Sequence, residues 1–546
     1  MTNLNFATLI ESMSDALNDA PAIYFGDRVM SWREYDDEAA RLANALSEAG
    51  LGKESKVGLL LYNCAEYMVG ALAAFKLRGV SININYRYSG DELQYLLEDS
   101  EAEALVFHSS LSAAVEDIRD KLSGLKLLVC VDDDGRSFSG ADSYADIISS
   151  KPAMERIERS PEDTHMLYTG GTTGMPKGVE YNIGVIINQF LSMAPMYFGI
   201  PQPETLEELI AGAKERAETG TNLVSMPASP LMHTAGMMNS GMLVQTLGGA
   251  LAVLASRSFD AQELWEVVEK RKAAHLVIVG DTFAKPMLKV LADEEAAGVK
   301  RDLTSLKTIV SSGVIFSQQS KLDLLERLDL QIIDAVGATE GGMAMQLSSR
   351  SLPPTETARF MAMPTTEIFS EDYQKLPRGC GEPGLIGMSG TLPRGYYRDD
   401  VKTEKTFKTI DGVRYGFSGD MGSIEQDGTM VLLGRGSGCI NTGGEKVYPE
   451  EVEEELKRHP TVTDCLVAGV PDDRFGERVS AVVSLSQPLN DPLKTLMDFA
   501  AERLARYKLP RRLLIVEQVP RMPNGKADYK KTKRLLEEKS AECHTV

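Results

Sequence analysis

The eleven residues YTGGTTGMPKG, Tyr168 to Gly178, contain four glycines, three threonines and a single lysine. They follow the strand-like MLY (166–168), which predicts a loop at a strand end, where α/β sheets bind ligands. Glycines let consecutive N–H groups form a concave anion nest, hydroxyls add donors, and Lys177 adds a positive charge. The pattern therefore predicts a polyphosphate site. It is not a Walker loop, because Gly178 follows the lysine.

Strands and helices alternate on both sides of this loop. The stretch 31–50 opens with a capping box, Ser31 to Glu34, and continues with apolar residues at helical spacing. A second capping box, Ser89 to Glu92, predicts another helix start. Strand-like runs are KVGLLLY (56–62), SININY (81–86), ALVFHS (104–109), LAVLA (251–255), HLVIVG (275–280), LKTIVSSG (306–313) and QIIDAVGATE (331–340). This alternation predicts α/β subdomains with doubly wound, parallel sheets.

The sequence pattern changes after Pro393. Residues 417–436 are rich in turns and short alternating strands. This predicts a small antiparallel sheet or barrel, a β-subdomain of the large N-terminal domain. Three glycines near Arg435 to Gly438 leave the backbone free to pivot. We therefore expect an N-terminal domain at 1–434 and a small, mobile α+β C-terminal domain at 435–546.

The composition excludes several classes of partner. A net charge of -21 repels nucleic acid and anionic lipid surfaces, so neither is an expected partner. Six scattered cysteines without a CxxC pair, and a start without a basic and apolar leader, favour the cytoplasm. Residues 219–256 carry no charged side chain, but prolines and glycines interrupt them, which favours buried interior over stable membrane insertion.

Six motifs occur in the order found in one enzyme superfamily. They are YTGGTTGMPKG, VGATEGG (336–342), GYYRD (395–399), FSGD (417–420), GRGSGCINTGGEKVYPEEVE (434–453) and PNGK (523–526). Together they resemble the adenylate-forming (ANL) superfamily of acyl- and aryl-CoA synthetases, luciferase and peptide-synthetase adenylation domains. Within it, the motifs look most like bacterial CoA ligases for fatty acids or sterol side-chain acids.

The resemblance implies which residues bind MgATP. The phosphates would be held by Thr169, Gly170, Gly171, Thr172, Thr173, Gly174 and Lys177. Glu340 would help to hold Mg²⁺, and Thr339 would contact the α-phosphate. Asp420 and Arg435 would bind the ribose hydroxyls. Ser312, Gly313 and Val314 stand where the family places its adenine-binding stretch, although the match is poor.

Lys526 aligns with the catalytic lysine of the C-terminal domain. Attack of a carboxylate on the α-phosphate brings two anions together, and a cation is needed to offset this charge. After the small domain rotates, Gly443, Gly444 and Glu445 would approach the pantetheine of coenzyme A. The family usually has Asp or Lys at the pivot, where this chain has Ser437, which puts the charged interactions of the pivot in doubt.

The third substrate is expected to be an apolar carboxylic acid. His233 matches a family position at the junction of adenylate and acyl group, and a core histidine is the alternative interpretation. Five methionines between Met226 and Met242 suit an adaptable apolar cavity or an ordinary core. No cationic residue lies between Glu218 and Arg257, which argues against a dicarboxylate or amino-acid substrate.

The motifs leave several functions open. The leading interpretation is an acid:CoA ligase, and the alternative is a stand-alone adenylation enzyme that loads a carrier-protein phosphopantetheine. A luciferase-like oxygenase shares the first half-reaction. A degenerate nucleotide-binding protein is disfavoured, because Lys177, Glu340, Asp420, Arg435 and Lys526 are all present. Dimers are common among relatives, so a homodimer is a possible assembly.

Overall fold

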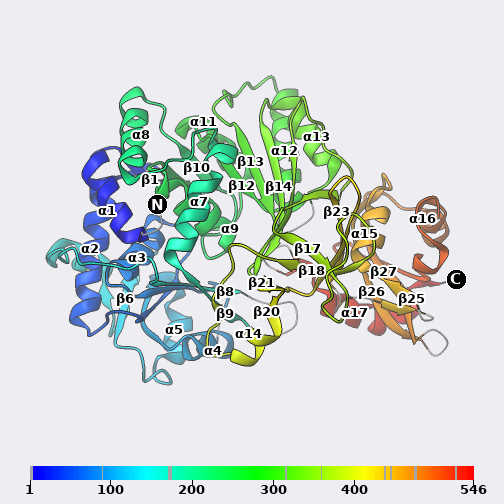
Figure 1. Ribbon diagram of the computed structural model, residues 1–546, viewed down its shortest axis with the longest axis horizontal. Coiled ribbons are helices and arrows are strands. Elements are labelled where there is room, and N and C mark those ends of the chain that lie inside the picture. Colours follow the sequence, from blue (N-terminus) through cyan, green and yellow to red (C-terminus); the bar gives the residue numbers. More distant parts are fainter. Residues whose placement is uncertain are drawn as a thin grey trace.

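The computed structural model describes residues 4–88, 90–169, 175–313, 316–357, 359–435, 438, 440–442, 445–472, 476–522 and 526–545. The chain forms an α/β body with a smaller C-terminal unit at one end of its long axis, orange to red in Figure 1. This confirms the expected fold class.

The largest sheet is built around parallel strands. Their order is β1 (Pro21–Phe25), β11 (Ala250–Val253), β10 (Val224–Pro227), β12 (His275–Ile278), β13 (Thr308–Ser312) and β14 (Gln331–Ala338), with β2 (Arg28–Ser31) at the edge. The helices α11 (Ala261–Arg271), α12 (Asp281–Ala296) and α13 (Gln318–Arg327) connect the later strands. The strand and helix alternation predicted for the middle of the chain is confirmed.

A second parallel sheet lies in the N-terminal part. Its order is β4 (Val80–Asn83), β3 (Lys56–Leu60), β5 (Ala102–His108), β6 (Leu127–Val131) and β7 (Asp142–Ser143). The expected capping box forms at α2 (Trp32–Glu48): the Ser31 hydroxyl accepts from the Glu34 N–H, and the Glu34 carboxylate accepts from the Ser31 N–H. The N-cap of α4 (Asp91–Asp99) is Gly90, and Ser89 of the second expected box lies outside the described residues.

Other helices cover these sheets or connect their strands. They are α1 (Phe6–Leu17), α3 (Ala65–Lys76), α5 (Ser112–Arg119), α6 (Tyr144–Ser150), α7 (Ile183–Phe198) and α8 (Leu206–Thr219).

The short strands between residues 341 and 435, apart from Gly395–Tyr396, are antiparallel, as expected for residues 417–436, but they do not form a separate sheet. Within the described residues they continue the large sheet to fifteen strands, because β15 pairs with β14. The extension comprises β15 (Gly341–Ser348), β16 (Arg359–Ala362), β23 (Thr429–Arg435), β22 (Asp420–Ile424), β18 (Gly384–Met388), β21 (Val413–Gly416) and β20 (Phe407–Ile410), with β17 (Thr366–Phe369) on β18.

A small antiparallel sheet carries the glycine-threonine segment. Its order is β19 (Gly395–Tyr396), β9 (Lys177–Asn182) and β8 (Thr164–Thr169), and α14 (Asp400–Thr406) follows β19. This sheet brings GYYRD, more than 200 residues away in sequence, beside the strand that begins with Lys177.

The C-terminal residues form an α+β unit with a sheet of their own. The sheet order is β25 (Glu445–Val447), β24 (Ile440–Thr442), β27 (Gly476–Leu485), β28 (Arg512–Ile515) and β29 (His544–Thr545), with β26 (Val462–Asp472) on β27. Its helices are α15 (Pro449–Lys457), α16 (Pro492–Ala500) and α17 (Tyr529–Glu538). Buried apolar residues such as Val452, Leu456 and Val467 form a core within this unit.

The stretch without charged residues is mainly interior. After β10 it forms the short helix α9 (Thr234–Gly236), a π-helix over Met237–Met242, α10 (Leu243–Thr246) and β11. Most of its side chains are buried. Among the described residues, no helix combines the length and apolar character needed to cross a membrane.

A buried ion pair fixes β14, the strand that leads to VGATEGG. Lys321 on α13 is 1% exposed, and its Nζ lies 2.5 Å from Asp334 Oδ2 on β14 and 2.7 Å from Gln346 Oε1 on β15. The pair therefore connects a helix to both strands of the hairpin at the proposed ATP site.

We predict that Lys321→Met lowers the unfolding free energy by about 3–5 kcal/mol, because it leaves a buried carboxylate without its charge partner. Lys289→Met, which breaks an exposed pair with Asp293, should cost about 1 kcal/mol or less. Urea denaturation compares the two variants. Equal shifts of the two midpoints would contradict the assigned importance of the buried pair.

Candidate functional site

The predicted phosphate loop connects β8 and β9. These strands are antiparallel, and Thr169 pairs with Lys177, so the two ends of the loop are held side by side. Lys177 is the first residue of β9, which fixes its backbone. Gly170, Gly171, Thr172, Thr173 and Gly174 lie outside the described residues.

The Lys177 ammonium lies among acidic and phenolic groups. Its Nζ is 3.7 Å from Asp99 Oδ1 and 4.0 Å from Asp399 Oδ2. Burial acts to lower the pKa of Lys177, but a hydrogen bond with Tyr95 and the two carboxylates outweigh it and raise that pKa. The Tyr168 hydroxyl donates to Asp99 Oδ2 at 2.9 Å. The lysine is thus held charged beside the loop, as a phosphate-binding lysine must be.

Thr339 and Glu340 form the turn between β14 and β15. The Tyr181 hydroxyl, from β9, donates to the Thr339 carbonyl, and the Tyr396 hydroxyl, from β19, donates to Glu340 Oε1. The small sheet that carries the phosphate loop therefore also orients the proposed magnesium ligand. Sequence reasoning did not identify these tyrosines as site residues, since their role depends on the pairing of β9 with β19.

His233 precedes α9 and the π-helix. Its Nε2 atom is buried and has no hydrogen-bond partner in the described part of the chain. Burial, together with the positive charges of Lys526 and Arg87, lowers the pKa of His233 to about 4. The imidazole is therefore neutral at pH 7. A glycine is required just after it, because a Cβ on Gly236 would lie 2.3 Å from the Pro230 carbonyl oxygen.

Lys526 belongs to the C-terminal unit, yet its charge acts on His233 of the N-terminal body. Its side chain is exposed. Contacts between the two parts include Lys285 Nζ of α12, which lies 3.5 Å from the Thr463 carbonyl oxygen. Of the residues that the sequence pattern singled out, Lys526 is thus near enough to His233 for its charge to lower the pKa of that histidine.

The proposed ribose residues are neighbours across two strands. Asp420 on β22 pairs directly with Arg435 on β23. The Ser418 hydroxyl donates to Asp420 Oδ2 at 2.5 Å. Asp420 and Arg435 therefore lie at paired backbone positions of neighbouring strands, although 14 residues lie between them in the chain.

The remaining predicted residues are only partly described. Ser312 ends β13, and Gly313 follows with a φ of 88°, whereas Val314 lies outside the described residues. Glu445 pairs with Thr442 across β25 and β24, and the intervening Gly443 and Gly444 also lie outside them.

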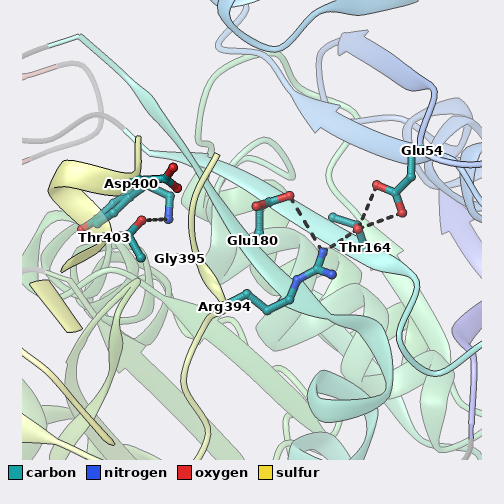
Figure 2. A pocket seen from close by; sticks show the side chains of 8 residues that line it. Glu54, Thr164, Glu180, Arg394, Gly395, Asp400 and Thr403 are labelled. Carbon is teal, nitrogen blue, oxygen red and sulfur yellow. Dashed lines mark hydrogen bonds and ion pairs between the residues drawn. The ribbon is translucent and has the colours of Figure 1, made fainter. Parts of the chain in front are cut away.

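A polar cavity of about 320 Å³ lies next to β19 (Figure 2). Arg394 Nη2 donates to Thr164 Oγ1 at 2.5 Å, and that hydroxyl lies 3.0 Å from both oxygens of Glu54. Its lining residues are Glu54, Thr164, Glu180, Arg394, Gly395, Tyr396, Asp400 and Thr403. Three carboxylates and one guanidinium line this cavity, with Arg394 3.8 Å from Glu180, so it does not suit an apolar acid.

Comparison with protein families gives two matches. A family model described as AMP-binding enzyme matches residues 11–397, and one described as AMP-binding enzyme C-terminal domain matches residues 451–526. They cover most of the chain.

Two curated ligases are similar over almost the whole length. A medium/long-chain-fatty-acid–CoA/3-oxocholest-4-en-26-oate–CoA ligase of Mycolicibacterium smegmatis is 35% identical over 99% of this chain and 98% of its own. A 3-oxocholest-4-en-26-oate–CoA ligase of Rhodococcus rhodochrous is 36% identical over 96% and 95%, respectively.

Solved structures share the fold. The anthranilate CoA ligase AuaEII in complex with anthranoyl-AMP has a TM-score of 0.83 at 22% identity, over 99% of both chains. ATP-bound MatB from Rhodopseudomonas palustris has a TM-score of 0.80 at 24% identity, over 98% of this chain and 99% of that one.

We predict that Lys526→Met raises the pKa of His233 above about 4, because it removes a nearby positive charge. A ¹³C-histidine NMR titration, with signals assigned through His233→Gln, measures this. The pKa of fully buried His275, about 3, should not change, since burial alone depresses it. An unchanged His233 pKa would show that the ammonium does not reach the imidazole.

Proposed function

Because this chain belongs to the AMP-binding enzyme family, we propose that it is an AMP-forming acid:CoA ligase whose carboxylic acid is mainly apolar. In the first half-reaction, a carboxylate oxygen attacks the α-phosphorus of ATP, and pyrophosphate leaves. In the second, the CoA thiol loses its proton and attacks the acyl carbonyl, and AMP leaves. The observation that carries the proposal is the match to the two AMP-binding family models and, over almost the whole chain, to curated CoA ligases.

The first half-reaction needs positive charge and a site that holds the acid still. Lys526 offsets the negative charge that builds up as the carboxylate meets the α-phosphate. His233 is neutral and therefore does not repel the positive charge of Lys526, and it borders the acyl group. Lys177 and the loop hold the ATP phosphates, while Asp420 and Arg435 hold the ribose. Thr339 contacts the α-phosphate, and Ser312, Gly313 and Val314 border the adenine.

The residues of the site suit a magnesium ion that has few protein ligands. Among the described residues, no cluster of three metal-ligating side chains exists. Glu340 presents one carboxylate, oriented by Tyr396, which suits an ion bound mainly through phosphate oxygens. When bound, Mg²⁺ would neutralise phosphate charge, and the role of Glu340 is to anchor it.

The second half-reaction needs a different face of the C-terminal domain, 435–546, presented to the large domain, 1–434. We place Gly443, Gly444 and Glu445 on this face, toward the pantetheine. The proposed pivot at residue 435 follows Gly434, whose φ of 101° is a backbone conformation that favours glycine. We propose that the boundary lies next to this glycine, at the end of β23.

The acid is proposed to be medium to long or bulky. The curated relatives are named for fatty acids and for a sterol acid. In this chain, Met232, Met237, Met238 and Met242 lie in the apolar core that surrounds the π-helix after His233. Flexible thioethers can adapt to acids of different shape.

We also propose a cytoplasmic location, which the scattered cysteines suit, and a homodimer, as is common among relatives. Fractionation of native cells tests the first, and sedimentation of the purified chain tests the second.

The function is tested with a panel of carboxylic acids, MgATP and CoA. Apolar acids should give pyrophosphate, AMP and an acyl-CoA detected by mass, whereas dicarboxylates and amino acids should give none. Lys526→Ala should lower adenylate formation by about a thousandfold or more, because it removes transition-state charge stabilisation. The same variant should still convert a pre-made adenylate to thioester. Normal adenylation by Lys526→Ala would contradict the role of this lysine.

The alternative thiol acceptor is tested by competition between free CoA and a holo-carrier protein. We expect acyl-CoA as the product at equal concentrations of the two thiols. Selective acylation of the carrier would instead favour a stand-alone adenylation enzyme.

A further inference from the structure

Lys526 stands on the stem of a hairpin. The Met522 N–H donates to the Lys526 carbonyl at 2.8 Å, and Arg521 forms an antiparallel bridge with Ala527. Because Lys526 is itself part of a closing pair of the stem, its backbone moves only if the stem moves. The position of the ammonium therefore depends on what anchors residues 521–527.

A bidentate ion pair anchors the stem to β26. Arg521 Nε lies 2.7 Å from Asp464 Oδ2, and Arg521 Nη2 lies 2.7 Å from Asp464 Oδ1. Both side chains are about three-quarters covered. The Cys465 N–H also donates to Asp464 Oδ1 at 2.8 Å, which fixes the carboxylate. A planar fork of this kind sets direction as well as distance.

Further charged side chains surround the ion pair between Asp464 and Arg521. Lys457 Nζ on α15 lies 3.9 Å from Asp464 Oδ1 and 3.9 Å from Glu453 Oε2. Glu453 is buried, accepts from the Val467 N–H at 2.8 Å, and accepts from the Tyr529 hydroxyl at 3.4 Å. Tyr529 begins α17, directly after the hairpin. The network therefore contacts the segment that carries Lys526 on both sides, through Arg521 before it and Tyr529 after it.

We propose that Asp464 and Arg521 form a positioning pair for the adenylation half-reaction. Neither residue touches the reactants; together they hold the hairpin so that the Lys526 ammonium meets the reacting phosphate beside His233. This inference rests on the proposed function. It extends that function by assigning a positioning role to the partly buried ion pair that anchors the hairpin of Lys526.

The test separates the half-reactions in the full-length enzyme. Arg521→Gln should lower acid-dependent pyrophosphate release by about tenfold to a hundredfold, the usual cost of displacing a catalytic group by about 1 Å. Thioester formation from purified acyl-adenylate and CoA should stay within about twofold, since this step does not use Lys526. Arg521→Lys keeps the charge without the fork and should recover part of the loss.

A double mutant distinguishes positioning from general stability. If Arg521 acts only through Lys526, then Arg521→Gln should cost nothing further in a Lys526→Ala background. Asp464→Asn should likewise add little to Arg521→Gln. The matched control is Arg503→Gln, which breaks a 3.0 Å pair with Glu455 in the same unit and should leave both half-reactions unchanged.

The proposal is overturned if Arg521→Gln slows both half-reactions equally, slows neither, or loses further activity without Lys526. If Arg521→Gln does not fold, the same comparisons with Arg521→Lys and Asp464→Asn decide. Failure of the wild-type enzyme to form any acyl-adenylate would instead refute the proposed function. The two failures are thus distinguishable.

Discussion

The structure depends on one electrostatic requirement. A positive charge on the smaller, C-terminal unit must act across its contact with the large body. The chain carries a net charge of -21, yet the proposed reaction joins a carboxylate to a triphosphate. Long-range electrostatics therefore work against substrate capture, and local cations must overcome them. We propose that Lys177 of the large body binds the phosphates; Lys526 belongs to the smaller unit, and its charge lowers the pKa of His233.

The contact between the two parts combines attraction with repulsion. Lys285 lies against the Thr463 carbonyl, which favours docking. On the same side, burial raises the pKa of Glu454; Lys457 opposes this rise, and the negative charge of Asp281 adds to it. These contacts suit the proposed motion, in which the C-terminal domain would dock for one half-reaction and leave for the next.

Local sequence patterns predicted the elements well and their long-range neighbours poorly. The Ser31 to Glu34 capping box and the parallel strands were predictable, because each depends on a few adjacent residues. The π-helix at Met237–Met242 has no comparable local signal, and the merging of the late antiparallel strands into the large sheet depends on the pairing of β14 with β15. The hydroxyls of Tyr181 and Tyr396 were likewise missed, since only folding brings them to Thr339 and Glu340. Motif order, by contrast, located Lys526 and His233 without any knowledge of their proximity.

We propose that the contact between Lys285 and Thr463 belongs to the domain arrangement that forms the adenylate. The most direct measurement crosslinks Lys285→Cys to Thr463→Cys with a short thiol reagent, in a chain whose Cys380 and Cys439 are serine, and then follows both half-reactions. The locked enzyme should release pyrophosphate with its acid at a rate close to that of the unlinked protein, but form no thioester until the link is cleaved. A locked enzyme that cannot form adenylate, or that forms thioester at the unlinked rate, would contradict this account.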